Sequence, residues 1–171
     1  ISRIFLGPII FIMLALNISD VLALLLFFLA GFTDYVDGYL ARKYDATSQI
    51  GEILDPIADK ILIIFLLLGL SIQLDSYIVG FAASIIISRE IWVSALRDYN
   101  ARNNNLEATK VTFLAKVKTT VQLFTISIYL IALSLNNMMF IIFGDILIII
   151  SALITLYTGY EYTVNSLKKS N

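Results

Sequence analysis

Long apolar runs alternate with short polar segments along the whole chain. Six runs have about the length of a membrane-crossing helix, and they span residues 4–19, 21–39, 53–73, 77–96, 117–135 and 138–164. None shows the period-two alternation of a membrane strand. Because a backbone in lipid must satisfy its own hydrogen bonds, each run predicts a helix. The pattern therefore predicts an all-α, polytopic membrane protein with six transmembrane helices.

The start of the chain is the least regular part of this pattern. The first run is short, and its connection to the second run is abrupt, so we expect a loop to be missing near Ser19–Asp20. The first residue is Ile1 rather than a methionine, so we expect a truncated N-terminus, with Arg3 the remainder of a substrate-contacting segment. No change in composition marks a second domain. We expect residues 1–171 to form a single integral-membrane domain.

Basic residues lie at every second connection. They occur near the N-terminus, at residues 42–43, between residues 97 and 118, and at the C-terminus, whereas residues 74–76 and 136–137 hold none. Cytoplasmic loops of membrane proteins carry an excess of Lys and Arg. The distribution therefore predicts that both termini lie in the cytoplasm, and an even number of spans agrees with this.

Composition narrows the possible functions. Hydrophobic residues make up 59% of the chain, above the roughly 45–50% of soluble domains. The net charge of −1 argues against a nucleic-acid-binding protein. The sequence contains no His and no Cys, which excludes histidine-based triads, thiol nucleophiles and disulfides. Catalysis in this chain must rest on carboxylates, Lys or Arg, hydroxyls, or hard metals held by oxygen.

Four aspartates form the clearest candidate site. Asp34 and Asp37 are three residues apart near the end of the second run, and Asp55 and Asp59 are four apart near the start of the third. Both spacings place the paired carboxylates on one helical face. Since a short loop joins the two helices, we expect the faces to meet at the cytoplasmic end of the bundle. A purely structural role would leave four aspartates in two helical pairs as a coincidence, because each is costly in a membrane helix.

Four such carboxylates need a positive partner. With no His or Cys available, all ligands are oxygen atoms, which suit Mg²⁺ or Mn²⁺. Four aspartates suffice for two divalent ions, and paired metals are a recurring device for phosphoryl transfer. Next to them, Gly38 allows a ligand to approach the backbone closely, and the Arg42 guanidinium suits a phosphate. The alternatives are helix packing by Gly38 and a membrane-surface anchor at Arg42.

The complete pattern reads D-x2-D-G-x2-A-R-x8-G-x3-D-x3-D. Its eight fixed positions are Asp34, Asp37, Gly38, Ala41, Arg42, Gly51, Asp55 and Asp59. This pattern resembles the signature of the CDP-alcohol phosphatidyltransferase family, whose members move a phosphatidyl group from a CDP-linked lipid to an alcohol and release CMP. The family's six-helix membrane core is also similar to the predicted layout.

The resemblance implies roles for these residues. Asp34, Asp37 and Asp55 would be metal ligands, and Asp59 would be a ligand or the catalytic base that takes the acceptor's proton. Positions associated with the CDP moiety correspond to Gly38, Ala41, Arg42 and Gly51. The resemblance also implies Mg²⁺ or Mn²⁺ as cofactor, CDP-diacylglycerol as lipid donor, and a homodimer.

A second set of charged residues concerns the acceptor. Cations within or beside the fourth and fifth runs could bind a phosphate on the acceptor; they are Arg89, Arg97, Lys116 and Lys118. The alternatives are an Arg89–Glu90 structural pair and snorkelling side chains. The local sequences SRE, ALRDY and KVKT, at residues 88–90, 95–99 and 116–119, are similar to those of the bacterial branch that makes phosphatidylglycerophosphate. That similarity implies sn-glycerol 3-phosphate as acceptor and a bacterial inner membrane as location.

Other functions remain open from the residues alone. A related transferase would use inositol phosphate or phosphatidylglycerol as acceptor. A divalent-cation transporter would also place carboxylates in membrane helices. Transporter sites, however, lie near the bilayer midplane at broken helices or repeats, whereas these acids cluster beside Arg42 near one end of the helices.

Overall fold

The computed structural model describes residues 2–44, 49–103, 105 and 112–168, which form helices and no strand. The helices are α1 (Ser2–Ala15), α2 (Asp20–Lys43), α3 (Gln49–Gln73), α4 (Tyr77–Arg102), α5 (Phe113–Leu135) and α6 (Met138–Lys168). Each overlaps one of the six predicted apolar runs. The prediction of an all-α protein is therefore confirmed for the described part of the chain.

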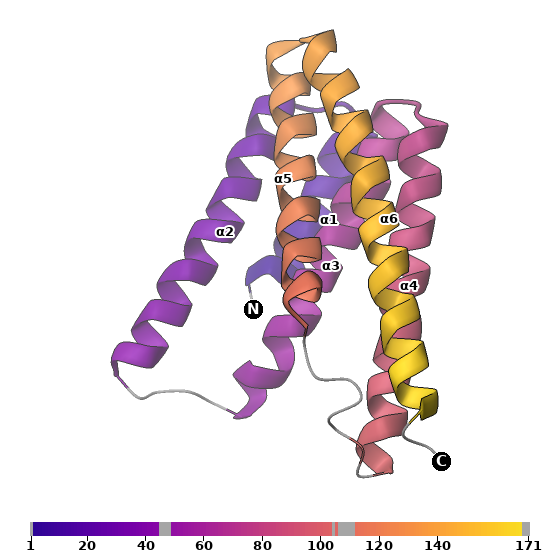
Figure 1. Ribbon diagram of the computed structural model, residues 1–171. Helices are drawn as coiled ribbons and strands as arrows, with labels where there is room; N and C mark the ends of the chain where they lie inside the picture. Colours follow the sequence, from indigo (N-terminus) through magenta and orange to yellow (C-terminus); the bar gives the residue numbers. More distant parts are fainter. Residues whose placement is uncertain (1, 45–48, 104, 106–111, 169–171) are drawn as a thin grey trace.

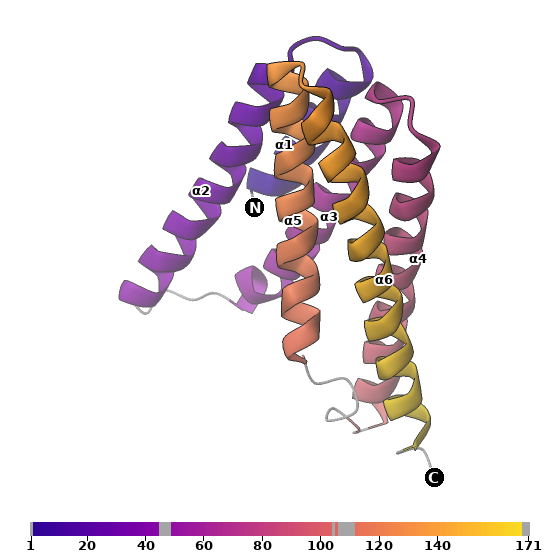
Figure 2. The same ribbon diagram turned by 45° about the horizontal axis from the view of Figure 1, so that its top comes forward.

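The helices form an up-and-down bundle (Figures 1 and 2). The connections α1–α2, α3–α4 and α5–α6 lie at the upper end in Figure 1, whereas α2, α4 and α6 end, and α3 and α5 begin, toward the lower end. The basic residues at the ends of α2 and α4, Lys43 and Arg102, therefore lie toward the lower end of the bundle. The lower parts of α2 and α3 carry the aspartates at this same end.

The three upper connections use the same local device. A residue in the left-handed region ends each preceding helix, and these residues are Asn17, Asp75 and Asn136, with φ of 51°, 46° and 49°. Asn and Asp tolerate this conformation better than most residues. The Ser19 hydroxyl then accepts a hydrogen bond from the backbone N–H of Leu22 and so begins α2. The chain makes the abrupt α1–α2 connection, where we expected a missing loop, with these residues alone.

Helix α1 packs closely against α3 because both helices carry a glycine at their contact. A Cβ at Gly7 would lie 3.3 Å from the Cα of Leu62, and one at Gly69 would lie 3.4 Å from the Cα of Phe11. Small residues let membrane helices approach in this way. Ile10, Leu14 and other α1 side chains then join the buried core, which includes residues of every helix.

Helix α1 also changes the expected relation between α2 and α3. It packs against both of them, and no Cα of α2 lies within 8 Å of a Cα of α3 in the described residues. Our expectation that these two helices meet face to face is therefore wrong. The physical reason is visible in the charges: two carboxylate-bearing faces repel each other, and α1 brings a cation to the space between them.

The exterior of the bundle is apolar. Four of the described helices combine the length and hydropathy needed to cross a bilayer, namely residues Asp20–Leu40 of α2 and the whole of α4, α5 and α6. Large apolar side chains such as Leu25, Phe32 and Leu153 are exposed on their outer faces. So much exposed apolar surface is typical of a face turned to lipid. The described residues thus form an all-helical protein with four membrane-capable helices, while α1 is a shorter apolar helix.

Candidate active site

Three of the four aspartates converge on one arginine. The guanidinium of Arg3, in the first turn of α1, forms ion pairs with Asp34 on α2 and Asp59 on α3. Asp55 Oδ1 lies 3.7 Å from Arg3 Nη2. The Arg3 side chain is only 6% exposed, so its charge requires these partners. Arg3 therefore occupies the space among the carboxylates that we expected a positive group to fill.

The remaining residues of the motif lie around this cluster. Asp37 is exposed, one turn beyond Asp34, and Gly38 is partly exposed beside it. Gly51 lies in the first turn of α3. Ala41 and Arg42 belong to the last turn of α2, but their side chains lie outside the described residues.

The donor atoms suit a hard divalent cation. Asp34, Asp55 and Asp59 come from two helices and turn their carboxylates toward one positive group. In the part of the chain that the structure describes, no three acidic side chains are already close enough to hold an ion. A guanidinium is larger than Mg²⁺, so carboxylates arranged around it lie further apart than ligands of a metal. The residues therefore fit a metal site in their chemistry, and metal binding stays a prediction.

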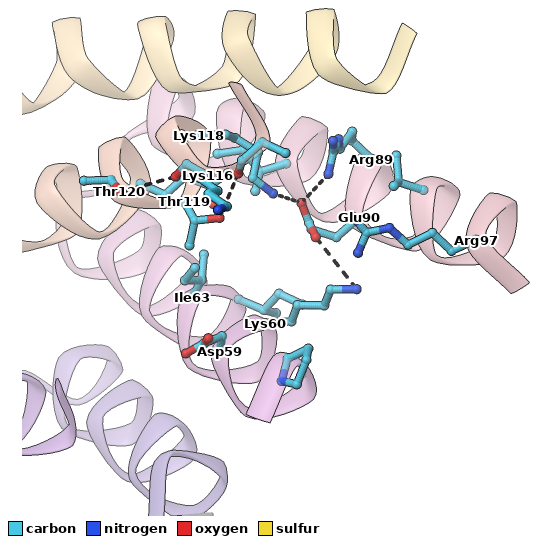
Figure 3. Close-up of a pocket in the computed structure, with 16 residues that line it drawn as sticks. Asp59, Lys60, Ile63, Arg89, Glu90, Arg97, Lys116, Lys118, Thr119 and Thr120 are labelled. Atoms are coloured by element: carbon cyan, nitrogen blue, oxygen red, sulfur yellow. Dashed lines mark hydrogen bonds and ion pairs between the residues drawn. The ribbon is translucent and has the colours of Figure 1, made fainter. Parts of the chain in front are cut away.

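A basic cavity of about 470 Å³ opens on the other side of Asp59 (Figure 3). It lies between α3, α4 and α5. Seven charged residues line it: Asp59, Lys60, Arg89, Glu90, Arg97, Lys116 and Lys118. Five of these are cations and two are carboxylates, so the cavity favours an anionic ligand. The structure brings together all four residues that we predicted to bind the acceptor's phosphate.

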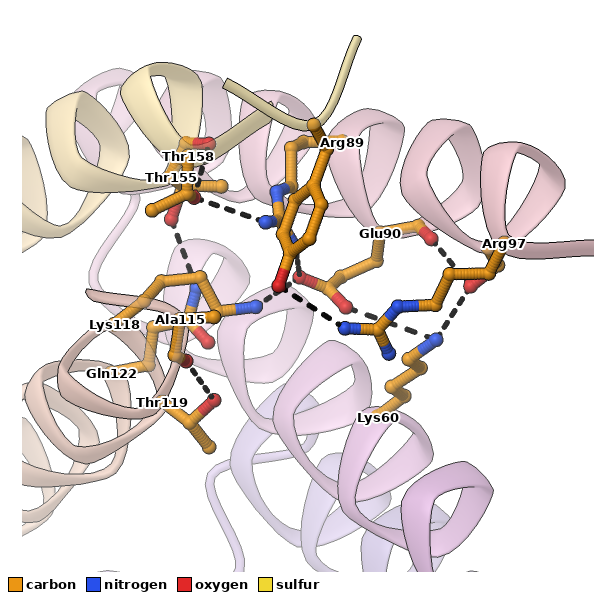
Figure 4. A network of polar contacts seen from close by, with 12 residues as sticks. Lys60, Arg89, Glu90, Arg97, Ala115, Lys118, Thr119, Gln122, Thr155 and Thr158 are labelled. Atoms are coloured by element: carbon orange, nitrogen blue, oxygen red, sulfur yellow. Dashed lines mark hydrogen bonds and ion pairs between the residues drawn. The ribbon is translucent and has the colours of Figure 1, made fainter. Parts of the chain in front are cut away.

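The Glu90 carboxylate is the centre of a buried network in this cavity (Figure 4). Its Oε1 accepts hydrogen bonds from Lys118 and, at 3.0 Å, from Arg89 Nη1. Its Oε2 lies 3.9 Å from Lys60 Nζ. Arg89 also donates through Nη2 to the hydroxyl of Thr158 on α6, at 3.0 Å. The network joins α3, α4, α5 and α6, and the Arg89–Glu90 pair that we named as an alternative is part of it.

Arg97 has different surroundings. Its Nη2 lies 3.5 Å from the hydroxyl of Tyr162, and its guanidinium carbon is 5.5 Å from the centre of that ring. Arg89 lies at the same distance from the ring centre. A guanidinium is attracted to an aromatic face at this distance. The buried Nε atoms of Arg89 and Arg97 have no hydrogen-bond partner among the described residues.

A second cavity, of about 440 Å³, lies between α1, α2, α3 and α5. Its wall is largely apolar and includes Phe27, Phe28 and Leu62. At its polar end are Arg3, Asp34 and Asp59. Asp59 therefore lines both cavities, the basic one and the apolar one.

Sequence analysis missed two parts of this site. It gave no role to Lys60, which directly follows Asp59 in the sequence and therefore points from another face of α3, toward α4. It also did not connect Glu90 to Lys118, which lies on a different helix. The only available signal in the sequence was that Lys60, Glu90 and Lys118 are ionisable residues within apolar segments.

Comparisons with known proteins show the family to which the chain belongs. A model of the CDP-alcohol phosphatidyltransferase family matches residues 1–158. A curated protein of Rickettsia bellii (strain RML369-C) is 36% identical over 165 residues, covering 95% of this chain and 89% of its own. One of Blochmanniella floridana is 40% identical over 151 residues, covering 87% and 78%. Both carry the name CDP-diacylglycerol–glycerol-3-phosphate 3-phosphatidyltransferase, as does a Haemophilus influenzae protein that is 36% identical over 149 residues, covering 87% and 79%.

Proposed function

We propose that this chain, which belongs to the CDP-alcohol phosphatidyltransferase family, transfers a phosphatidyl group from CDP-diacylglycerol to sn-glycerol 3-phosphate and releases CMP. The names of its relatives support both substrates. The observation that carries the proposal is the position of Asp59 between two cavities of opposite character. The apolar cavity suits part of a lipid donor, and the basic cavity suits an acceptor that bears a phosphate.

In this proposal Asp59 is the catalytic base. It accepts the proton of an acceptor hydroxyl, whose oxygen forms a bond to the phosphorus atom that carries the lipid. The bond between that phosphorus and the bridging oxygen breaks, and CMP leaves with the electron pair. Arg89, Arg97, Lys116 and Lys118 hold the acceptor's phosphate, so that its hydroxyl is presented to Asp59.

The four aspartates together also serve as candidate metal ligands. Asp34, Asp37, Asp55 and Asp59 are the residues that would hold two divalent ions, Mg²⁺ or Mn²⁺. Such ions, when bound, neutralise the diphosphate and stabilise the leaving CMP. The convergence of three of these carboxylates on Arg3 supports this assignment, because it shows that they attract a common cation.

The CDP moiety would bind along the end of α2 and the start of α3. Gly38, Ala41, Arg42 and Gly51 are the motif positions for this role. The absence of a side chain at Gly38 leaves its backbone open to the nucleotide, and the Arg42 guanidinium suits a phosphate.

The same proposal includes the protein's place in the cell. All six helices would cross a bacterial inner membrane, with both termini and the active site in the cytoplasm. The basic connections at one end of the bundle support this orientation. At 31 residues and about 1.5 Å per residue, α6 exceeds the roughly 30 Å hydrocarbon core, so its lower end would project into water beside the site. We also propose a homodimer.

The test is CMP release by the purified protein in detergent, with CDP-diacylglycerol and Mg²⁺ or Mn²⁺. The acceptors to compare are sn-glycerol 3-phosphate, inositol 1-phosphate, serine and phosphatidylglycerol. We expect release with sn-glycerol 3-phosphate alone. CMP release with another acceptor would change the proposed acceptor but leave the proposed transfer reaction in place. If a folded, metal-binding protein releases no CMP with any of them, the transferase proposal fails and a cation transporter becomes the better one.

A further inference from the structure

Glu90 has surroundings that a simple ion pair does not explain. Its side chain is 13% exposed, and cations from three different helices lie around it: Lys60 on α3, Arg89 on α4 and Lys118 on α5. One carboxylate oxygen accepts hydrogen bonds from Arg89 and Lys118, and the other faces the ammonium group of Lys60. This single negative charge therefore binds Arg89 and Lys118 directly and attracts Lys60, whose ammonium donates a hydrogen bond to the Ser94 hydroxyl at 2.5 Å.

The other two cations of the cavity are arranged differently. Neither Arg97 nor Lys116 forms an ion pair with a described residue. The guanidinium of Arg97 contacts the ring and hydroxyl of Tyr162, and its buried Nε has no hydrogen-bond partner among the described residues. The cavity thus has an inner group of three cations, Lys60, Arg89 and Lys118, whose charge is partly offset by Glu90. Its outer group, Arg97 and Lys116, has no such partner among the described residues, so its charge is available to a ligand.

We propose that Glu90 is a positioning residue that sets the phosphate affinity of this cavity. It offsets part of the charge of Lys60, Arg89 and Lys118, so that these cations attract the acceptor's phosphate less strongly than Arg97 and Lys116 do. This proposal rests on the proposed function, since it concerns how the acceptor binds.

The charges give a reason for such a residue. Without Glu90, five cations would face a cavity whose one remaining carboxylate is Asp59. Any phosphate would bind there strongly, including inorganic phosphate and the released CMP. An internal carboxylate weakens this unselective attraction and holds the cations at fixed positions, so that a bound acceptor presents its hydroxyl in one orientation.

The experiment compares Glu90→Gln with the unmodified protein. Inorganic phosphate is added to each purified protein in detergent, and protection against heat unfolding gives the phosphate concentration for half-maximal protection. We expect this concentration to fall on the order of tenfold in E90Q, because one negative charge a few ångströms from the ligand has been removed. We also expect kcat with sn-glycerol 3-phosphate to fall while its KM does not rise.

Further variants separate charge from structure. Glu90→Asp keeps the charge and should keep the phosphate response of the unmodified protein. Asp98→Asn is the matched control, since Asp98 is an exposed carboxylate on the same helix that pairs with Arg102. It should change neither the phosphate response nor kcat.

If E90Q does not fold, the double variant E90Q/K118Q, which removes one negative and one positive charge, tests the same proposal. Replacing both members of a buried ion pair is better tolerated than replacing one. E90Q/K118Q should therefore fold, and it should bind phosphate more tightly than Lys118→Gln alone, which keeps the negative charge of Glu90.

Two outcomes would overturn the proposal. If phosphate protects E90Q no better than the unmodified protein, or if E90Q/K118Q binds phosphate no better than K118Q, Glu90 only supports the fold. Failure of the proposed function is distinguishable, because it would appear as missing CMP release by the unmodified protein while the phosphate responses still differ among the variants.

Discussion

The two halves of the site are opposites in charge but alike in construction. On one side, three half-exposed carboxylates surround the buried guanidinium of Arg3. On the other side, three cations surround the buried carboxylate of Glu90. Each half therefore contains an internal charge of the sign that its ligand would bring. The comparison indicates that one half is adapted to a cation and the other to an anion, and that Asp59 lies where they meet.

The largest expected effect concerns Asp59, which belongs to both halves. In Asp59→Asn the side chain keeps its shape but does not take up the proton of the acceptor. We expect the rate of CMP release to fall by roughly 10²–10⁴-fold, the usual contribution of a general base. The measurement is initial rate with saturating CDP-diacylglycerol and sn-glycerol 3-phosphate.

Asp98→Asn makes the same chemical change on an exposed helix surface and should leave the rate unchanged. An active D59N with an unchanged rate would show that Asp59 is not the base.

The anion half can be tested alone through Arg97. Arg97→Gln removes a cation whose charge is not neutralised by a described carboxylate. Hydrogen bonds to charged groups are worth enough that we expect KM for sn-glycerol 3-phosphate to rise roughly 10- to 100-fold. KM for CDP-diacylglycerol should change little, because that substrate is assigned to the other half.

The matched control for this test is Arg102→Gln, on the same helix. Arg102 is largely exposed and pairs with Asp98 outside the cavity. Equal effects of R97Q and R102Q on KM would contradict the assignment of the acceptor to the cavity.

The cation half can be tested through Arg3. Its guanidinium occupies the space among Asp34, Asp55 and Asp59 and so competes for them with a divalent ion. In Arg3→Gln we expect Mn²⁺ to protect the protein against heat unfolding at a concentration roughly fivefold lower. Without metal, the variant should be less stable than the unmodified protein, since its carboxylates lose their counter-charge.

Protection by Mn²⁺ that is unchanged in R3Q would mean that the ion binds elsewhere. The R102Q variant, which alters a distant exposed arginine, should show the metal response of the unmodified protein.

The fold could be predicted from the sequence because its signal is local. Each of the six apolar runs corresponds to a helix. The predicted and observed boundaries differ where a helix end depends on a turn conformation or on contacts with another helix. Helix α1 stops at Ala15 because Asn17 adopts a left-handed conformation. Helix α4 continues beyond the apolar run to Arg102, and its last turns are held by polar contacts with α6, such as the hydrogen bond from Asn100 to Ser166.

The site was predictable only in part. The aspartates were identified because spacings of three and four residues determine a shared helical face without any knowledge of packing. The position of Arg3 among them depends on α1 packing between α2 and α3, which no local spacing indicates. The network of Lys60, Glu90 and Lys118 likewise requires three helices to meet. The sequence therefore suggested Glu90 and Lys118 but not their contact, and it gave no role to Lys60.

The smallest expected effect sharpens the role of Arg89, which belongs to the inner cations. A Cβ at Gly159 of α6 would lie 3.0 Å from Arg89 Cγ, closer than side chains ordinarily pack. The Arg89 stem has little freedom to move away, since its guanidinium is held by Glu90 and Thr158. In Gly159→Ala we therefore expect the guanidinium to shift slightly and KM for sn-glycerol 3-phosphate to rise about twofold, since a small displacement weakens rather than removes a charged hydrogen bond.

Gly80→Ala on α4 is the control for G159A. Its Cβ would meet only the Ser71 side chain, at an ordinary 3.8 Å. This variant should therefore be more stable than the unmodified protein by roughly 0.5–1 kcal/mol, the amount by which Ala stabilises a helix relative to Gly. Its KM should stay unchanged. If G159A instead behaves like G80A in both stability and KM, Arg89 tolerates displacement. The phosphate would then be held by the outer cations alone, and the contrast between inner cations offset by Glu90 and available outer cations would become sharper.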